Sequence, residues 1–394
     1  MKDHLVVRHF GPIKDLDIQI NKLTLFIGTQ GSGKSTISKL LTICRDMNWY
    51  LCILEEKEVL KPFFDFYIDE YFHPDTFIHY RNEINGVEIT YNAGIFKCKI
   101  NEYTKEESIS IINYWIDSAN DDLIIKSATK GQKLLNSTNT IDNKVIQANS
   151  RYILYIPAER NLIGNLSSAL ASIMLAKIPL SDSIIEYMSL FEKAKKEFPK
   201  YEIPFLGVSY ERKDGKERIS ILNEDTDLPL NACSSGLQSV LPMIMVIDYA
   251  LKVESFDSFV IEEPEQNLFP QNQCELLSFI SSKQADNEKE NRQFVITTHS
   301  PYLLSYLNVL MLAHKLYNNE EIKDEVASIV HPNRMVDPAN VAVYNLDPEG
   351  EVYCKSLIAE RTGMISVNSL DSASEYIGEN YDKLYRLFLK TKRK

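Results

Sequence analysis

The chain has 394 residues, of which 44% are hydrophobic and 25% are charged, and its formal net charge is −12 at pH 7. These ordinary globular values exclude disordered and fibrous classes, and the length allows about two or three domains or one large domain with an insertion. The negative charge argues against a protein that coats nucleic acid indiscriminately, while a local basic groove stays open. The 6 cysteines lack C-x-x-C spacing, which favours reduced thiols over a zinc site or a disulfide framework.

The first residues and the apolar stretches favour a cytoplasmic protein. Charged side chains lie among the first eight residues, where a signal peptide needs an apolar core. The most apolar stretch, residues 163–180, contains Asn165, three serines and Lys177. A buried or dimer-facing helix fits that composition better than a membrane span. We therefore expect a cytoplasmic location and no membrane partner.

A glycine-rich motif lies between an apolar strand predicted over 23–27 and a helix predicted over 36–43. Residues 28–35 match the phosphate-loop pattern G-x-x-x-x-G-K-[ST] in the strand-to-helix context that the motif requires. Glycines let backbone N–H groups approach phosphate oxygens, Lys34 is expected to bridge the β and γ oxygens, and Ser35 is expected to hold Mg²⁺. The chain is therefore predicted to bind a nucleoside triphosphate. The nucleotide-binding residues predicted in this loop are Gly28, Gln30, Gly31, Ser32, Gly33, Lys34, Ser35 and Thr36.

The sequence between this helix and the next motifs, residues 46–229, predicts a lobe of strands and helices. An aromatic-dense stretch over 49–80 is interpreted as the core of a small lobe, with a docking surface as the alternative. A β-like segment follows over 86–100. Helices are predicted over 160–200, with Ser181 as a cap and without the sustained heptads of a long coiled-coil arm.

Two polar motifs further along the chain indicate phosphate and metal chemistry. Residues 234–238, Ser-Ser-Gly-Leu-Gln, open an apolar helical run, which predicts either a second phosphate-binding helix N-terminus or an ordinary helix cap. Glu262 and Glu263 follow an apolar strand over 258–261, at the sheet edge where α/β folds bind ligands. In this Walker B arrangement Glu262 is predicted to help hold Mg²⁺, directly or through water. Glu263 is predicted to orient or deprotonate the attacking water, with a solvated acidic turn as the alternative.

A histidine completes the set of candidate catalytic residues. His299 follows another β-branched apolar strand, over 294–298, about one helix and one strand after Glu263. This interval is typical of a βαβ unit, so both residues are expected at the same edge of one sheet. We expect His299 to hydrogen-bond the γ-phosphate and the attacking water.

In the order P-loop, Ser-Ser-Gly-Leu-Gln, Glu-Glu and His, the motifs resemble the ATP-binding-cassette (ABC) superfamily. More narrowly, they look like its soluble SMC-like and OLD-like ATPases, often described as AAA-type proteins of bacterial defence systems. Residues 6–18 look like the antiparallel strand pair that precedes the P-loop there, and residues 261–270 are similar to the E-E-P-E-x-x-L-H-P element. The resemblance covers residues 1–45 and 230–305.

This resemblance implies an α/β fold of the P-loop NTPase, ABC-ATPase type. It implies a central, mostly parallel sheet with an antiparallel β lobe and a helical insertion subdomain. The ATPase core is expected over residues 1–45 and 230–394, with residues 46–229 as an inserted lobe. Glu262 stands where the family has Asp, and Leu237 where it has the second Gly of the signature. Those departures put rate and metal preference in question.

The resemblance also implies contacts between subunits. Ser235 and Gly236, with Gln238 in the same signature motif, are expected to contact the nucleotide held by the other subunit's P-loop, so hydrolysis needs a dimer. Residues 265–268 correspond to the D-loop that links the two sites. Glu159 and Arg160 lie where the family's Q-loop lies, although no glutamine is present. Both a structural ion pair and a metal or phosphate contact fit that pair.

The sequence thus predicts an ATPase that binds ATP and Mg²⁺ and forms a homodimer or higher homo-oligomer. The resemblance implies a regulatory switch for a separately encoded nuclease or toxin, in phage defence. The alternative is a DNA-binding, DNA-stimulated ATPase of repair or recombination, for which the basic tail over 390–394 is a weak indication. The function of a transporter's nucleotide-binding subunit is disfavoured, because such subunits have no insertion as large as residues 46–230 of this chain.

Overall fold

The computed structural model of the chain describes residues 3–83, 86–101, 106, 152–162, 180–213, 216–221, 227–252, 256–285, 292–366, 380–381 and 383–384. Two predicted features lie outside these residues: most of the apolar stretch 163–180 and the basic tail 390–394. None of the helices in the described part of the chain has both the length and the apolarity that crossing a bilayer requires.

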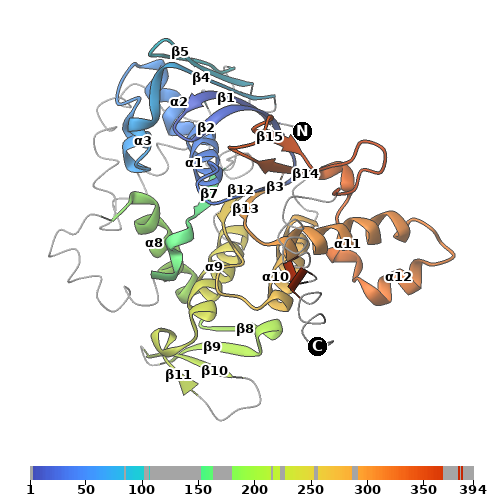
Figure 1. Ribbon diagram of the computed structural model, residues 1–394. Helices are drawn as coiled ribbons and strands as arrows, with labels where there is room; N and C mark the ends of the chain where they lie inside the picture. The colour runs from blue at the N-terminus through green and yellow to red at the C-terminus, as the bar shows by residue number, and fades with distance from the viewer. Residues whose placement is uncertain are drawn as a thin grey trace, which may run out of the picture.

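A six-stranded sheet forms the centre of the molecule, in the strand order β15-β14-β3-β13-β12-β7 (Figure 1). The five parallel strands are β3 (Leu23–Gly28), β7 (Tyr152–Ile156), β12 (Phe256–Glu262), β13 (Gln293–Thr298) and β14 (Val341–Leu346). A sixth strand, β15 (Cys354–Ser356), pairs with β14 in the antiparallel direction. Parallel strands buried on both faces need nearly continuous apolar runs, and the strands predicted before the P-loop, Glu262 and His299 have them. The mostly parallel central sheet is therefore confirmed.

Alternate residues of each central strand enter two different cores. In β3, Leu25 and Ile27 pack into one core, which they share with helices α8 (Asp182–Glu197), α9 (Ser235–Lys252), α10 (Pro270–Ala285) and α11 (Pro301–Tyr317). The intervening Phe26 packs into the other, which it shares with α1 (Lys34–Arg45) and the antiparallel lobe. Because side chains along a strand alternate between faces, the sheet separates the helical layer from α1 and the lobe.

The antiparallel lobe is a five-stranded sheet in the order β2-β1-β4-β5-β6 (Figure 1). Its strands are β1 (Asp3–Phe10), β2 (Ile13–Ile20), β4 (Phe72–Asn82), β5 (Val87–Asn92) and β6 (Ile95–Lys99). The strand pair predicted over 6–18 and the β-like segment over 86–100 are confirmed. Trp49 of α2 (Met47–Leu54) and Phe63 of α3 (Lys61–Asp65) are buried in the core beside this sheet. The aromatic stretch thus contributes to a core, as interpreted.

The segment 46–229 contributes strands to three sheets, and the predicted division of the chain into a core and an inserted lobe stays a prediction. Strands β4 to β6 extend the sheet that β1 and β2 begin, and β7 pairs with β12 inside the central sheet. A third, antiparallel sheet follows α8, with the order β11-β10-β9-β8. Its strands are β8 (Lys200–Ile203), β9 (Val208–Lys213), β10 (Lys216–Ile221) and β11 (Asp227–Leu228). Pairing between strands that lie far apart in the sequence determines which sheet each strand joins, and local sequence patterns do not predict such pairing.

Capping side chains mark the start of several helices. Ser181 caps α8, because its side chain accepts a hydrogen bond from the Ile184 N–H at 3.4 Å, so the predicted cap is confirmed. Beyond α11 the chain forms α12 (Lys323–Ile329) before it enters β14. Short 3₁₀ turns are η1 (Asp69–Tyr71), η4 (Ala158–Leu162), η5 (Pro204–Leu206), η6 (Leu230–Ala232), η7 (Pro332–Arg334) and η8 (Pro338–Asn340).

A buried ion pair joins the antiparallel lobe to the central sheet. Arg45, the last residue of α1, donates from Nε to the Asp3 carboxylate of β1 at 2.8 Å. Its Nη1 donates to Ser258 Oγ of β12 at 2.7 Å, and the Tyr80 hydroxyl of β4 donates to the same Asp3 oxygen at 3.0 Å. The Arg45 side chain is only 6% exposed and the Asp3 side chain 1%, so each buried charge depends on the other for its neutralisation.

We expect Arg45→Met to lower the free energy of unfolding by about 3–5 kcal/mol, because it leaves a buried Asp3 carboxylate without its cation. Urea denaturation followed by circular dichroism measures this change. The matched control is Arg8→Ala, which removes the exposed pair between Arg8 of β1 and Asp15 of β2. That change should cost about 1 kcal/mol or less. Equal losses in the two variants would contradict the assigned role of the buried pair.

Candidate functional site

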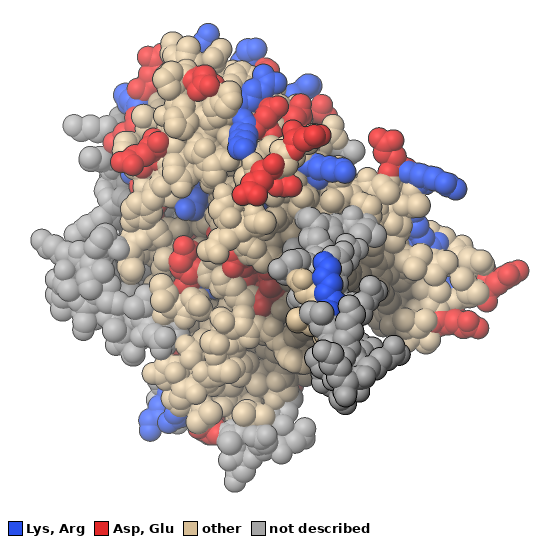
Figure 2. Space-filling view, in the orientation of Figure 1, with Lys and Arg blue, Asp and Glu red and all other residues tan. Residues whose placement is uncertain are grey.

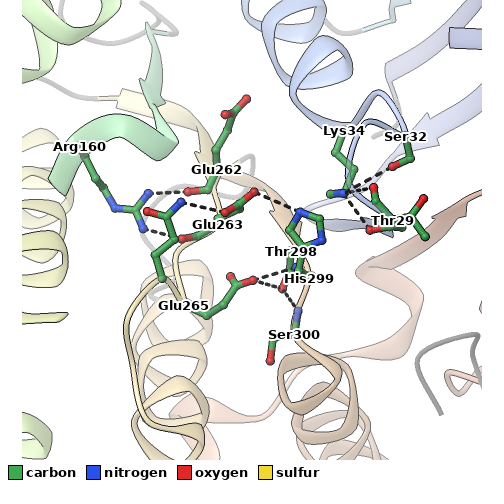
Figure 3. Close-up of polar contacts among 12 residues, drawn as sticks. Thr29, Ser32, Lys34, Arg160, Glu262, Glu263, Glu265, Thr298, His299 and Ser300 are labelled. Carbon is green, nitrogen blue, oxygen red and sulfur yellow. Dashed lines mark hydrogen bonds and ion pairs between the residues drawn. The ribbon is translucent and has the colours of Figure 1, made fainter. Parts of the chain in front are cut away.

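The register of the central strands brings three predicted motifs to one edge of the sheet. In the parallel pairing Ile27 of β3 lies opposite Thr298 of β13, and Thr297 lies opposite Glu262 of β12. The P-loop, the Glu-Glu pair and His299 all follow these positions directly. They therefore gather at the carboxyl ends of neighbouring strands (Figure 3), which is where α/β sheets bind ligands.

The P-loop has the backbone of an anion-binding site. Helix α1 begins at Lys34, preceded by Gly33 in the left-handed region at φ 94°, and no side chain caps its first N–H groups. A Cβ on Gly33 would lie 2.6 Å from the Tyr353 hydroxyl, and one on Gly28 would lie 2.4 Å from the Leu346 carbonyl oxygen. Only glycine fits at either position. The uncapped N–H groups and the helix dipole are what a phosphate group requires.

Lys34 is held inside the loop by backbone oxygens. Its Nζ donates to the carbonyls of Gly28 and Thr29, each at 2.9 Å, and lies 3.5 Å from Ser32 Oγ (Figure 3). Burial lowers the pKa of Lys34 to about 8, while the nearby carboxylates, Glu263 first, act in the opposite direction. These acceptors are neutral dipoles, so the positive charge of Lys34 stays available for an anionic ligand.

Ser35 and Glu262 fit the Mg²⁺ that the motifs imply. The Glu262 side chain is buried, and its Oε1 has no hydrogen-bond partner among the described residues. Burial raises the pKa of Glu262 to about 7, although hydrogen bonds with the Tyr155 and Ser35 hydroxyls lower it. In the described part of the chain no cluster of three or more His, Cys, Asp or Glu is placed to hold a metal. A Mg²⁺ ion here would take one hydroxyl and one carboxylate from the protein, and its other ligands from nucleotide and water.

Glu263 and His299, the two predicted catalytic residues, contact each other. His299 Nε2 lies 3.2 Å from Glu263 Oε1, and Gln266 Nε2 donates to Glu263 Oε2 at 2.8 Å. The hydrogen bond with His299, followed by that with Gln266, lowers the pKa of Glu263 to about 2. Glu263 is therefore a carboxylate at neutral pH. It accepts hydrogen bonds well, but it is a weak base while both partners hold it.

Glu265 connects the turn after Glu263 to the histidine strand. Its Oε1 accepts from the Thr298 hydroxyl at 2.6 Å and from the His299 backbone N–H at 2.9 Å (Figure 3). Ser300 then caps α11 by accepting from the Tyr302 and Leu303 N–H groups. Burial raises the pKa of Glu265 above its usual range, opposed by the two hydrogen bonds. The carboxylate thus fixes the backbone that carries His299.

The predicted signature motif opens α9, as expected, but it makes local contacts. Ser235 is exposed at the first position of the helix. Gly236 is buried against the turn that follows Glu263, since a Cβ there would lie 2.7 Å from the Asn267 carbonyl oxygen. Gln238 Nε2 donates to the carbonyls of Cys233 at 2.8 Å and Asn231 at 3.3 Å. The predicted nucleotide contact of Gln238 requires its amide to leave these carbonyls.

Arg160 corrects the interpretation of the Q-loop position. Among the described residues no ion pair of Arg160 is found, and its guanidinium is not exposed to bind phosphate, because Arg160 is 0% exposed and bonds to backbone carbonyls. Nη1 donates to the Glu262 carbonyl at 2.5 Å and Nη2 to the Glu263 carbonyl at 2.5 Å. Glu159, its neighbour, is exposed.

Three further site residues were not predicted from the sequence. Tyr155 reaches Glu262 from the neighbouring strand, Gln266 bonds to Glu263, and Thr298 bonds to Glu265. Gln266 lies within the predicted D-loop, residues 265–268, and Thr298 ends the strand predicted before His299, but the sequence assigned neither residue a contact at this edge. Tyr155 carries no local signal, because only the pairing of β7 with β12 places it there.

The fold and the site together define a nucleoside-triphosphate-binding protein of the P-loop class, with ABC-type motifs gathered at one sheet edge. The model of the family described as "AAA ATPase domain" matches residues 1–304. Because these residues make up more than half of the chain, the chain belongs to the AAA ATPase domain family. A search among curated proteins finds no significant match.

Solved structures similar to this chain include three SMC heads, each 14% identical to it. The first is an SMC head bound to the C-winged helix domain of ScpA; the match covers 77% of this chain and 92% of that chain, with a TM-score of 0.39. The second is the SMC head domain from Thermotoga maritima, with 77% of this chain and 91% of that chain covered and a TM-score of 0.37. The third is the Smc head domain with an extended coiled coil bound to the C-terminal domain of ScpA derived from Pyrococcus furiosus, with 96% of this chain and 99% of that chain covered and a TM-score of 0.40. At these scores the likeness says nothing about the activity or the partners of this chain.

We expect Lys34→Ala to weaken ATP binding by about 10- to 100-fold, because hydrogen bonds to charged groups contribute about 1.5–3 kcal/mol. Titration of a fluorescent ATP analogue measures the dissociation constant. Lys22→Ala, at the opposite end of β3, is the control and should bind like the wild type. Equal affinities in the wild type and Lys34→Ala would contradict the phosphate role of this lysine.

Proposed function

We propose that this protein hydrolyses ATP in a dimer, and that the cycle of closing and hydrolysis makes it a regulatory switch for a separately encoded effector. The contact between Glu263 and His299, beside the P-loop, is the single observation that best supports hydrolysis. A carboxylate and an imidazole at this position have the chemistry to orient water against a γ-phosphate. Ser35 and Glu262 would hold Mg²⁺, which supplies charge neutralisation when it is bound.

Within one chain, the residues have these roles. The P-loop N–H groups and Lys34 bind the phosphates, and Glu263 orients the attacking water through its carboxylate. Because the pKa of Glu263 is about 2 in the structure, proton abstraction requires His299 or Gln266 to release it first. A γ-phosphate offers His299 a competing acceptor, so binding of the nucleotide would release Glu263 where it is needed.

Two groups of contacts, those of Lys34 and those of Glu263, support the role of a switch. Lys34 donates to loop carbonyls, and Glu263 is held by His299 and Gln266. A bound triphosphate would compete for Lys34 and His299 together. It would therefore interact more strongly with an arrangement in which both side chains have left these partners than with the arrangement that keeps them. Such differential binding is what a ligand needs to shift a two-state equilibrium.

Dimerisation is proposed because α9 presents an exposed N-terminus beside the turn after Glu263. Ser235 and Gly236 would contact the nucleotide held by a second copy, as the signature motif of ABC-type ATPases does. A nucleic-acid-stimulated ATPase is the less favoured function. On the face shown in Figure 2, acidic and basic side chains are interspersed over the antiparallel lobe, whereas nucleic acid binding favours a continuous basic surface.

We expect Glu263→Gln to lower turnover by about 100-fold or more, as loss of a general base typically does, and to accumulate an ATP-bound dimer. Light scattering with and without Mg-ATP measures the mass, and Ser235→Arg in the same chain should abolish the shift. A mass that does not respond to ATP, in a protein that binds ATP, would contradict the ATP-dependent dimer.

Mixing inactive variants tests whether the site is shared. A mixture of Lys34→Ala and Ser235→Arg should recover about a quarter of wild-type turnover, since half of the dimers are mixed and each holds one intact site. The control mixture, Lys34→Ala with Glu263→Gln, should stay inactive, because both residues serve the same subunit's site. Full activity of Ser235→Arg alone would place the whole site in one subunit.

The switch role has its own expected outcome. Lys34→Ala should hold the protein open and Glu263→Gln should hold it closed, so the two variants should shift the activity of a co-expressed effector in opposite directions. Growth of cells that express each variant with products of neighbouring genes measures this. Identical growth with both variants, at equal protein levels, would restrict the function to ATP hydrolysis.

A further inference from the structure

Arg160 is the buried cation closest to the catalytic turn, and phosphate binding does not use it. It lies in η4, directly after β7, and its side chain is 0% exposed. All of its hydrogen bonds among the described residues go to backbone carbonyls: Pro157 at 3.1 Å, and Glu262 and Glu263 at 2.5 Å each. Figure 3 shows the guanidinium pointing at the main chain of the Glu-Glu pair.

The peptide that Arg160 holds is in an unusual conformation. Glu263 has φ 43°, in the left-handed region that non-glycine residues seldom adopt. Its N–H donates to the Thr297 carbonyl at 2.9 Å, and its own carbonyl accepts from Arg160 and from the Gln266 N–H. Residues held in such a conformation persist only where the surroundings fix them, and they cluster at functional sites.

The geometry points to Arg160 as a positioning residue for the catalytic carboxylate, an inference that rests on the proposed function. The planar guanidinium donates in parallel to two successive carbonyls, so it fixes the orientation of the peptide between Glu262 and Glu263. That orientation determines the direction in which the Glu263 side chain leaves the backbone, and so its contact with His299. Because Arg160 is fully buried and donates to the backbone of the Glu-Glu pair, it would act through Glu263.

A second consequence concerns the elements behind Arg160. Both α8 and α9 contact η4, and the buried Tyr187 of α8 lies close enough to Arg160 to affect its pKa. Arg160 is thus fixed from the helical layer and donates into the sheet edge. A displacement of either helix would be passed to the Glu262 and Glu263 carbonyls.

The experiment compares the full chain with two variants, Arg160→Gln and Arg160→Lys. We expect the kcat for ATP hydrolysis to fall about 100-fold, since a misplacement of about 1 Å has that effect, while the KM for ATP and the affinity for a fluorescent ATP analogue stay within about twofold. Lysine keeps the charge but lacks the planar fork that serves two acceptors, so Arg160→Lys should not restore kcat. Wild-type kcat in either folded variant would overturn the inference.

A second readout does not depend on turnover. NMR of ¹³C-labelled histidine in the nucleotide-free protein reports the His299 ring among 7 histidines, and Glu263→Gln defines its signal without the carboxylate contact. Both Arg160 variants should move the His299 signal toward that position and leave the other signals in place. An unmoved His299 signal would overturn the inference. A wild-type protein without ATPase activity would refute the proposed function alone, and the NMR comparison would still decide the role of Arg160.

Lys195→Met is the matched control for loss of a buried cation. Lys195 of α8 is 3% exposed and pairs with Glu192 and Glu217, away from the sheet edge. Its loss should lower stability, measured by urea denaturation, and leave both kcat and the His299 signal unchanged. If Lys195→Met lowers kcat as much as the Arg160 variants do, the effect is general destabilisation and the positioning role is wrong.

Discussion

The site depends on the parallel, in-register pairing of β3, β13 and β12. A slip of one residue would turn every side chain of a strand to the opposite face. Here that slip would exchange Leu25 and Ile27 with Phe26 between two fully packed cores. Burial on both faces therefore fixes the register, and the register fixes where the strands end. The P-loop, Glu262 and His299 meet because the hydrophobic cores on the two sides of the sheet allow no other alignment.

The charges at this edge are stabilised differently from the charge deeper in the molecule. Arg45 is neutralised by a buried carboxylate, Asp3, and so joins two sheets. Lys34 and Arg160 instead donate to backbone carbonyls, and Glu265 accepts from a hydroxyl and an N–H group. Neutral partners offset the cost of burial but leave the charge itself uncompensated. An incoming phosphate group would therefore meet the Lys34 ammonium, which loop carbonyls already hold in place.

Much of the fold and part of the site follow from local sequence. The P-loop, the two polar strand ends and the start of α9 are adjacent to their own strands or helices, so pattern and order predict them. The contacts made by Arg160 and Tyr155 do not follow, because both depend on β7 pairing with β12 across about 100 residues of chain. The same pairing brings one strand of the segment 46–229 into the central sheet, which local patterns do not indicate. The amide of Gln238 donates to two carbonyls of its own turn, and its predicted contact with a nucleotide stays a prediction.

Helix α9 has a special position in this arrangement. It extends over 18 residues, or about 27 Å at 1.5 Å per residue, and is buried along most of its length. Its first turn carries Ser235 and Gly236 and packs on the turn after Glu263, and the helix also contacts η4, which holds Arg160. A second copy that pressed on the N-terminus of α9 would thus reach the catalytic turn by two routes: directly through Gly236, and through η4 to the Glu262 and Glu263 carbonyls. Packed interfaces pass a displacement on with little local deformation, although Pro242 interrupts the hydrogen bonding in the interior of α9. Closure of the proposed dimer and the placement of Glu263 are therefore coupled through the same helix.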